Sequence, residues 1–298
     1  MIFLTGGTGY VGQRLLARLT ARGARVRCLV MPGDPVDLAA RFPVEVVRAD
    51  LLDPAALEKA GAAVTAVVHS AALMLPNPPE RIRAVNVDGT ANMLRLAQAW
   101  GARRFVYMSA VSAVYAAMNS YGRSKADAER LVRESGLDYT ILRPTMVYGE
   151  GGGLHFAKLV GTLRKLPLVV PIVGSGAARL QPVWVEDVVT AIETVLASPR
   201  AAGRAYNVSG ATVVRFDEFL DMIFAVTGLR RAKLRVPLWL CTAGAHTLSA
   251  LLPSSFVSPE AILGLSQNAD LDHSEFRDEC GYQPVTLDVG LRKAFGRA

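Results

Sequence analysis

The sequence predicts an α/β fold in which a doubly wound parallel sheet is followed by a smaller C-terminal domain. Short apolar runs alternate with helical patterns through the first half of the 298-residue chain. This rhythm of strand, helix and strand indicates parallel strands that are joined by helical crossovers. Runs such as Ala66-Val67-Val68 are apolar at consecutive positions, as expected for a central strand that helices cover on both faces.

The predicted elements of the first half follow one another in regular order. Strand-like runs span residues 2–5, 25–30, 44–48, 66–69, 104–109 and 139–142. Between most of them, apolar residues recur at helical spacing, at residues 10–21, 81–100 and 124–134. Because parallel strands need such long connections, each helix is expected to cross over one face of the sheet.

The chain changes in character after Tyr148. A glycine-rich break, Glu150-Gly151-Gly152-Gly153, opens a loop-rich stretch that contains several prolines. A helix at residues 185–196 and a strand at residues 205–208 are then expected to return to the main sheet. We therefore predict a first domain at residues 1–150, joined by residues 185–208, and a second region at residues 151–184 and 209–298.

Composition restricts the classes of protein that fit this chain. Its 51% of hydrophobic residues can fill a core, and its formal net charge of +7 comes mostly from scattered arginines. The densest basic cluster is Arg230, Arg231, Lys233 and Arg235. It lacks the interleaved aromatic residues of a nucleic-acid platform, so we predict no nucleic-acid binding. The three cysteines and four histidines are far apart, which predicts no metal site and fits the cytoplasm.

The sequence also predicts that the chain has neither a secretory signal nor a membrane span. Met1 runs directly into the first strand, without the basic and apolar regions of a signal peptide. Residues 236–259 contain no Asp, Glu, Lys or Arg, but Pro237 and Pro253 interrupt them before the about 20 residues that a spanning helix needs. We interpret this stretch as a buried or substrate-covering helix. Because the basic cluster precedes it, peripheral contact with a membrane surface is the alternative.

A glycine-rich loop follows the first strand. The segment reads Leu4-Thr5-Gly6-Gly7-Thr8-Gly9-Tyr10-Val11-Gly12, with GxGxxG at its last three glycines. Such a loop turns tightly and brings backbone N–H groups close to a pyrophosphate, where side chains would obstruct the approach. The helix that follows directs its N-terminus at the anion. This context predicts a dinucleotide site on a Rossmann fold, with contacts from Gly6 through Gly12.

The end of the second strand bears on the choice of dinucleotide. The Rossmann fingerprint expects an acidic residue there, which would bind the 2′-hydroxyl of the ribose. This strand instead ends at Met31, and Asp34 comes only after Pro32-Gly33. The missing carboxylate removes the repulsion that would exclude a 2′-phosphate, and Arg27 is near in sequence. We therefore favour NADP(H) over NAD(H).

Tyr121 and Lys125 form a YxxxK pair. Residues four apart lie on the same face of a helix, so the two side chains are neighbours if the helix predicted at residues 124–134 begins one turn earlier. A neighbouring ammonium group stabilises a phenolate and lowers the tyrosine pKa from its ordinary value of about 10. The phenol can then exchange a proton near neutral pH while a carbonyl becomes an alcohol, or the reverse. The YxxxK spacing is common by itself, so a surface tyrosine near a surface lysine is the alternative to such chemistry.

The glycine loop and the YxxxK pair together resemble the short-chain dehydrogenase/reductase superfamily, in the extended or atypical branch that is epimerase/dehydratase-like. Further resembling segments are Ala49-Asp50-Leu51, His69-Ser70-Ala71-Ala72, Val85-Asn86-Val87-Asp88-Gly89-Thr90, Leu142-Arg143-Pro144, Val147-Tyr148-Gly149 and Pro182-Val183-Trp184-Val185-Glu186-Asp187-Val188. The resemblance covers most of the chain.

The resemblance implies roles for residues at these positions. Contacts with the cofactor are implied for Met31, Asp50, Leu51, Ser70, Ala71, Ala72, Tyr121, Lys125, Pro144 and Val147. Lys125 would hold the cofactor ribose, and Asn86 would be structural or part of a proton relay. A homodimer through the long helices at residues 81–100 and 124–134 is also implied. Structural interpretations stand beside these: Asp53 as a helix cap, His69 as a buried histidine and Arg143 as a loop anchor.

One position departs from the pattern of the superfamily, which supplies a hydroxyl beside the tyrosine from the end of the fifth strand. Without a gap, that position is Ala110. We expect Ser112 to replace it, with Ser109 as the alternative. Loss of one donor that polarises a carbonyl costs about 10² to 10³ in rate in other enzymes.

The favoured function is an NAD(P)-dependent ketone reductase or alcohol dehydrogenase that acts on a small, apolar substrate bound by the second region. Apolar residues of the last third, such as Trp239, Leu248, Leu251, Leu252 and Phe256, favour such a substrate. A nucleotide-sugar epimerase or dehydratase is an alternative, although Leu180-Gln181 replaces the expected Arg-Asp pair. A second alternative is a non-catalytic NAD(P)H-binding accessory or assembly protein, similar to the nucleotide-carrying subunit of respiratory complex I.

Overall fold

The computed structural model describes residues 1–166, 168–251 and 259–296. A seven-stranded sheet runs through its first half, in the order β11-β6-β5-β4-β1-β2-β3, and every pair of neighbouring strands is parallel. The strands are β1 (Ile2–Thr5), β2 (Val26–Val30), β3 (Glu45–Arg48), β4 (Ala66–His69), β5 (Arg104–Met108), β6 (Asp138–Pro144) and β11 (Arg204–Val208). The predicted strands and the return of the chain at residues 205–208 are thus confirmed.

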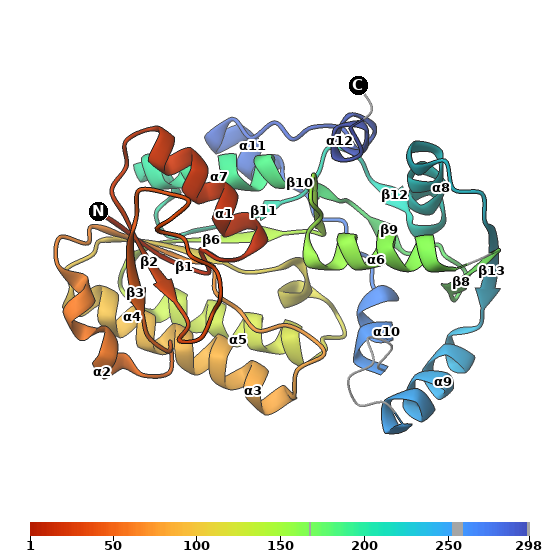
Figure 1. The fold of residues 1–298 in the computed structure, drawn as a ribbon, viewed down its shortest axis with the longest axis horizontal. Coiled ribbons are helices and arrows are strands. Elements are labelled where there is room, and N and C mark those ends of the chain that lie inside the picture. Colours follow the sequence, from red (N-terminus) through yellow and green to blue (C-terminus); the bar gives the residue numbers. More distant parts are fainter. Residues whose placement is uncertain (167, 252–258, 297–298) are drawn as a thin grey trace.

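Helices cover both faces of this sheet (Figure 1). One face carries α1 (Tyr10–Ala21) and α7 (Val185–Ala197), and the other carries α4 (Gly89–Ala99) and α5 (Ser120–Glu134). Consecutive strand residues enter different cores, since Leu4 packs with the first pair of helices and Phe3 with the second. This explains why the central strands are apolar at successive positions.

Shorter elements connect the strands. They are α2 (Pro54–Leu57), a 3₁₀ turn at Glu58–Gly61, α3 (Pro79–Arg83), a π-helical turn at Ala84–Asp88, and 3₁₀ turns at Val111–Val114 and Pro199–Ala201. The side chain of Asp53 accepts a hydrogen bond from the Ala56 amide, with Pro54 next in the chain. The predicted helix cap at Asp53 is therefore confirmed.

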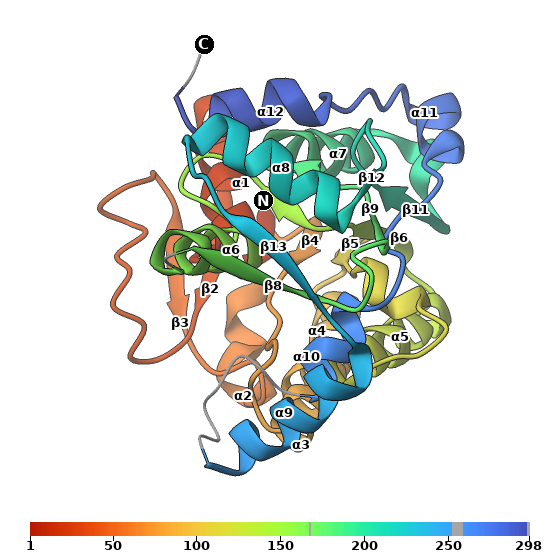
Figure 2. The same cartoon turned by 90° about the vertical axis from the view of Figure 1, so that its right-hand side faces the viewer.

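The second region has its own core and three short strand pairs. Its helices are α6 (Leu154–Lys165), α8 (Phe216–Thr227), α9 (Leu238–Leu251), α10 (Pro259–Leu265) and α12 (Leu287–Ala294). The pairs are β7 (Val147–Tyr148) with β10 (Val183–Trp184), β9 (Arg179–Leu180) with β12 (Val214–Arg215), and β8 (Val169–Val173) with β13 (Ala232–Val236). Figure 2 shows β8 and β13 on one side of the molecule, with α9 continuing from β13.

The chain returns to the parallel sheet a second time near its end. The short helix α11 (Ser274–Cys280) packs on β11, where the rings of Tyr206 and Phe276 stack with their centroids 4.6 Å apart. Tyr282 stacks on the other side of Phe276, at 4.8 Å. These contacts extend the core around α1 and α7, which no local pattern in the sequence indicated.

The start of the stretch at residues 236–259 is not buried, which departs from one of its two interpretations, a buried or a substrate-covering helix. It contains α9, whose first side chains are exposed: Leu238, Trp239 and Leu240. Leu252 and Phe256 lie outside the described residues, as do the side chains of Leu248 and Leu251. Within the described part of the chain, no helix is both long and apolar enough to cross a membrane.

Candidate active site

The glycine loop lies at the edge of the sheet where the parallel strands end. Gly6 has a φ of +75°, and a Cβ there would lie 2.8 Å from the backbone N of Ala71. A Cβ at Gly12 would lie 2.1 Å from the Gly6 carbonyl oxygen. The Thr5 hydroxyl accepts hydrogen bonds from the amides of Ser70 and Ala71. The loop is therefore in direct contact with the segment after β4, and side chains would separate them.

The first turn of α1 is suited to an anion. It begins after Gly9 without a side-chain cap and contains no acidic residue. The Thr8 carbonyl accepts a hydrogen bond from Gln13, and the Tyr10 hydroxyl donates to the Glu150 carbonyl at 3.0 Å. Backbone N–H groups at such a helix end bind phosphate through hydrogen bonds and the helix dipole. The loop and this open turn therefore fit the pyrophosphate of a dinucleotide.

The surroundings of Met31 contain arginines other than the one that the sequence suggested. Arg27 is bound to Glu45 at 2.8 Å and to the carbonyl of Ala62 at 3.0 Å, so it turns away from the end of β2. Met31 itself is exposed. Two exposed arginines contact α1 and the segment after β2: Arg41 donates to Gln13 of α1 at 2.5 Å, and Arg48 donates to the carbonyl of Asp34 at 3.2 Å.

Two of the implied cofactor contacts, Asp50 and Leu51, lie in the segment after β3. One carboxylate oxygen of Asp50 accepts a hydrogen bond from the Leu52 amide at 2.9 Å, which forms a local turn. Leu51 is buried against Gly89, where a Cβ would lie 2.6 Å from the leucine side chain. The Asn92 amide donates to the Leu51 carbonyl. Asp50 therefore keeps one oxygen outside this turn.

Helix α5 carries the predicted Tyr–Lys pair, and its first turn is capped by the side chain of Asn119. Lys125 is 1% exposed, and its Nζ donates to the Met108 carbonyl at 2.6 Å. The same Nζ lies 4.3 Å from the centre of the Tyr107 ring. Burial lowers the pKa of Lys125 to about 7, against the opposing charge of Glu129.

The pKa of Tyr121 moves in the direction opposite to the one expected from its neighbouring lysine. Burial raises the pKa of Tyr121 to about 12. The Lys125 ammonium group donates to the Met108 carbonyl at the end of β5. Loss of hydration in the buried site disfavours the charged phenolate, and this raises the pKa. In this state Tyr121 is protonated at neutral pH and can donate a proton.

The two candidate serines are in different environments. The Ser109 hydroxyl donates to Glu129 at 2.6 Å, and Arg143 binds the same carboxylate at 2.8 and 2.5 Å. Burial opposes ionisation of Glu129, but the hydrogen bonds from Arg143 and Ser109 hold its pKa below the usual value. Ser109 is therefore part of a buried ion-pair network, in which Arg143 is the predicted anchor.

Ser112 lies in the 3₁₀ turn that packs against the start of α5. A Cβ at Gly122 would lie 2.6 Å from the Ser112 carbonyl oxygen, so the two backbones meet directly beside Tyr121. The Ser112 hydroxyl is buried, and among the described residues it has no hydrogen-bond partner. An unpaired buried hydroxyl is costly, which is consistent with a donor kept for another molecule.

A polar network beneath this site joins the strands to the helices. His69 is 1% exposed, and its ring nitrogens lie 2.7 Å from the Thr5 hydroxyl and 3.1 Å from the Thr90 hydroxyl. Burial, with the nearby charge of Lys125, lowers the pKa of His69 to about 3. His69 is thus the neutral, buried histidine that the structural interpretation predicts.

Asn86 connects the segment after β4 to the helix of the Tyr–Lys pair. Its amide donates to the carbonyl of Leu73 and to the hydroxyl of Ser124, both at 2.9 Å, and its oxygen accepts from the Leu73 amide at 2.7 Å. These contacts fix the position of α5 relative to the loop edge. Asn86 therefore holds the segment after β4 against Ser124 of α5.

The second region reaches the site through a residue that the sequence did not single out. Glu260, at the start of α10, accepts a hydrogen bond from the Ser120 hydroxyl at 2.5 Å and lies 3.7 Å from Arg123. Ser120 directly precedes Tyr121. Because Glu260 is distant in sequence and stands in no motif, only its contact with α5 identifies it.

Gln181, which stands where nucleotide-sugar enzymes would carry a charged pair, is buried and joins two loops. Its amide donates to the Gly210 carbonyl at 2.7 Å, and its oxygen accepts from the Leu271 amide at 3.0 Å. Arg179 forms an ion pair with Asp270 at 2.9 Å. Both side chains are thus engaged within the protein.

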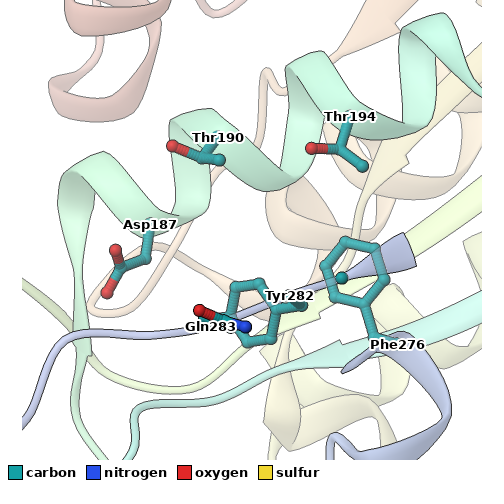
Figure 3. Close-up of a pocket in the computed structure, with 7 residues that line it drawn as sticks. Asp187, Thr190, Thr194, Phe276, Tyr282 and Gln283 are labelled. Carbon is teal, nitrogen blue, oxygen red and sulfur yellow. The ribbon is translucent and has the colours of Figure 1, made fainter. Parts of the chain in front are cut away.

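A small pocket of about 200 Å³ lies apart from this site, between α7 and the end of α11 (Figure 3). It is lined by Asp187, Thr190, Thr194, Phe276, Gly281, Tyr282 and Gln283. One carboxylate oxygen of Asp187 is already bound to the Val285 amide at 2.8 Å. Because α7 and α5 cover opposite faces of the sheet, this pocket is separate from Tyr121.

The parallel sheet with a glycine loop after its first strand defines a Rossmann-type dinucleotide-binding protein. Residues 2–209 match the profile of the NAD dependent epimerase/dehydratase family. The chain belongs to this family, as the resemblance of its motifs implied.

Relatives with different substrates are similar over nearly the whole chain. The 3 beta-hydroxysteroid dehydrogenase/Delta 5-->4-isomerase of Mycobacterium tuberculosis is 27% identical, over 95% of this chain and 86% of its own. The ceramide reductase of Caulobacter vibrioides is 28% identical, over 93% and 85%. A short-chain dehydrogenase/reductase superfamily protein from Agrobacterium tumefaciens, solved with bound NAD, has the same fold (TM-score 0.78, 23% identity, 100% and 96% covered).

Proposed function

We propose that this protein is an NAD(P)-dependent reductase or dehydrogenase that acts on a small, apolar carbonyl or hydroxyl compound. The observation that carries the proposal is the meeting of three groups at one sheet edge. Tyr121, the buried Lys125 and the unpaired hydroxyl of Ser112 gather where β5 ends, on the edge that also carries the glycine loop. Ligands of open parallel sheets bind at this edge.

The residues for a dinucleotide divide between its two ends. The loop at residues 6–12 would hold the pyrophosphate, and the segments at Ser70–Ala72, Pro144 and Val147 would flank the nicotinamide. We favour NADP(H), because the end of β2 carries Met31 and no carboxylate. Arg41 and Arg48, which project beside α1 and Asp34, would balance the charge of a 2′-phosphate.

The bound nicotinamide would supply or accept the hydride, and the side chains would handle the proton. Tyr121 would donate its proton to the oxygen of the substrate as a carbonyl is reduced, and its raised pKa keeps it protonated before that step. Ser112 would donate a hydrogen bond to the same oxygen. Lys125 would hold the cofactor ribose beside Tyr121 and supply the positive charge that favours a phenolate after the transfer.

Two observations support an apolar substrate. Gln181 is uncharged, buried and bound on both sides of its amide, and the exposed Arg179 is paired with the carboxylate of Asp270, so this loop offers little net positive charge to the diphosphate of a nucleotide sugar. Two of the relatives are named for hydroxysteroids and ceramide, which are largely apolar molecules. We therefore favour a hydrophobic ketone or secondary alcohol over a nucleotide sugar.

The first experiment combines nucleotide binding with turnover. Binding of NADPH and NADH is followed by nicotinamide fluorescence, and a panel of cyclic and long-chain ketones is screened with the preferred nucleotide. The Tyr121→Phe variant is expected to lose at least about 10²-fold in kcat with unchanged nucleotide affinity. Ser112→Ala is expected to lose about 10²-fold. Tyr139→Phe, on the same sheet but outside the site, is the control.

Two outcomes would contradict this assignment. Full activity of Tyr121→Phe would remove the tyrosine from the mechanism. Tight nucleotide binding without turnover of any carbonyl would instead support a non-catalytic role, in which the nucleotide is a structural or sensing ligand.

A further inference from the structure

The paired strands β8 and β13 present an apolar face to solvent. Their register places Ala232 opposite Val169 and Leu234 opposite Pro171. Because paired residues share a face and alternate along a strand, these four side chains lie together, and all four are exposed. Val170 on the opposite face of β8 is buried in the core of the second region. This ribbon lies at the end of the molecule far from the N-terminus (Figures 1 and 2).

The exposed apolar surface continues beyond both ends of the ribbon. Before β8, Leu168 is 74% exposed, and at the start of α9 Trp239 is 69% exposed between Leu238 and Leu240. We call the side chains of Leu168, Val169, Pro171, Ala232, Leu234, Leu238, Trp239 and Leu240 the apolar face. Large apolar side chains gathered on a surface mark a site of interaction with another molecule or a membrane.

Basic side chains outnumber acidic ones around this face. Residues 151–185 and 222–259 contain no aspartate or glutamate and carry eight lysines and arginines. Three of these eight form ion pairs: Lys233 with Asp221, Arg235 with Asp217 and Arg179 with Asp270. Four of the eight lie at the start of the ribbon, and we call them the basic rim: Arg164, Lys165, Arg230 and Arg231. Two hydrogen bonds bring the end of α6 and the start of β13 together. Arg231 donates to the Leu166 carbonyl at 2.6 Å, and the Ala232 amide donates to the Leu168 carbonyl at 2.9 Å. Arg164, Lys165 and Arg230 are exposed.

We propose that the apolar face docks on the surface of an anionic lipid bilayer. Leucine and tryptophan side chains would enter the headgroup region, where tryptophan is favoured, and the basic rim would contact acidic headgroups. Contact with a second copy of the chain would place two basic rims against each other, which repel. A nucleic acid would match the charge but would leave the leucines without partners.

The test is sedimentation of the full chain with two kinds of vesicle, one of phosphatidylcholine alone and one that also contains about 30% phosphatidylglycerol, which gives the surface a negative potential. We expect binding to the anionic vesicles only, and a loss of binding as salt is raised. Vesicles with brominated acyl chains should quench the fluorescence of Trp239. Trp239→Phe identifies its share, since of the other two tryptophans Trp184 is buried and Trp100 is half-buried against Phe3.

Matched variants separate the two parts of the surface. The Leu234→Ser/Trp239→Ser double variant and the Arg164→Glu/Arg230→Glu double variant should each bind anionic vesicles at least about tenfold more weakly. Val289→Ser and Arg200→Glu alter an exposed valine and an exposed arginine elsewhere and should bind like the natural protein. Circular dichroism confirms that each variant is folded.

Three outcomes would overturn the proposal. The first is that the protein binds neutral and anionic vesicles equally well, or binds neither. The second is a salt-sensitive affinity for DNA that the Leu234→Ser/Trp239→Ser variant retains. The third is a dimer in sedimentation equilibrium that this variant abolishes, because the face would then be an interface between copies.

Discussion

At the scale of single residues, the site combines groups whose surroundings shift their proton affinities. Lys125 is almost fully enclosed, with its ammonium bound to the Met108 carbonyl beside the face of Tyr107. Burial shifts the pKa of Tyr121, His69 and Lys125 in the direction that favours the neutral form of each group. The sequence could indicate that Tyr121 and Lys125 are neighbours, but their pKa shifts depend on the burial that the whole fold imposes.

The buried lysine makes a prediction about stability. The pKa of Lys125 is about 7 in the folded chain and near 10.5 when unfolded, so the unfolded chain binds more protons between these values. The free energy of unfolding should therefore rise with pH above 7, by up to about 1.4 kcal/mol per pH unit from this group. Lys125→Met removes this contribution, so urea unfolding between pH 7 and 9 should show a shallower slope for the variant.

The control for this measurement is Lys59→Met, which changes an exposed lysine. Its pH profile should run parallel to that of the natural protein. Parallel profiles for Lys125→Met as well would mean that Lys125 remains charged in the folded chain across this range.

At the scale of elements, the junction of β1 with α1 is the most constrained part of the site. The Gly12→Ala change adds a methyl group 2.1 Å from the Gly6 carbonyl oxygen. This clash can be relieved only if backbone atoms of the loop move. We expect nucleotide affinity to fall at least about tenfold and the protein to lose about 1–3 kcal/mol of stability. Fluorescence titration and urea unfolding measure the two effects.

Gly161 provides the matched control, because it also lies within a helix, α6, but a Cβ added there would have no atom of the described residues within 4 Å. Gly161→Ala should increase stability by about 0.5–1 kcal/mol and leave nucleotide affinity unchanged. If Gly12→Ala bound the nucleotide normally, the close approach within the loop would not be needed for the cofactor.

At the scale of the whole molecule, local patterns predict the parallel sheet well and the second region poorly. The strands of residues 2–69 and the return of β11 follow from apolar runs and crossover spacing, which are properties of short segments. The ribbon of β8 and β13 joins residues 63 positions apart, and the stacking of Phe276 on Tyr206 joins residues 70 apart. Such pairings depend on how surfaces fit after the sheet has formed, so a single sequence does not specify them.

The same reasoning applies to the site. The glycine loop and the Tyr–Lys pair were visible because their chemistry requires fixed spacing. The roles of the serines were not, since Ser109 and Ser112 differ only in their partners: Ser109 donates to Glu129, whereas the buried Ser112 hydroxyl has no partner among the described residues. Glu260 was missed for the same reason, because its role comes from contact with Ser120 across the molecule.

That contact gives the last prediction, since Glu260 ties the second region to the helix of the Tyr–Lys pair. Besides the Ser120 hydrogen bond, the Glu260 carbonyl accepts from the Asn119 amide at 3.3 Å. Hydrogen bonds to charged groups are worth about 1.5–3 kcal/mol. Glu260→Ala should therefore increase amide hydrogen exchange in α10 about tenfold, while α1 on the far side of the sheet exchanges as before.

The control is Glu275→Ala, which removes an exposed carboxylate on α11 and should leave the exchange of α10 unchanged. Equal exchange in α10 for Glu260→Ala and the natural protein would show that the docking of α10 rests on other contacts.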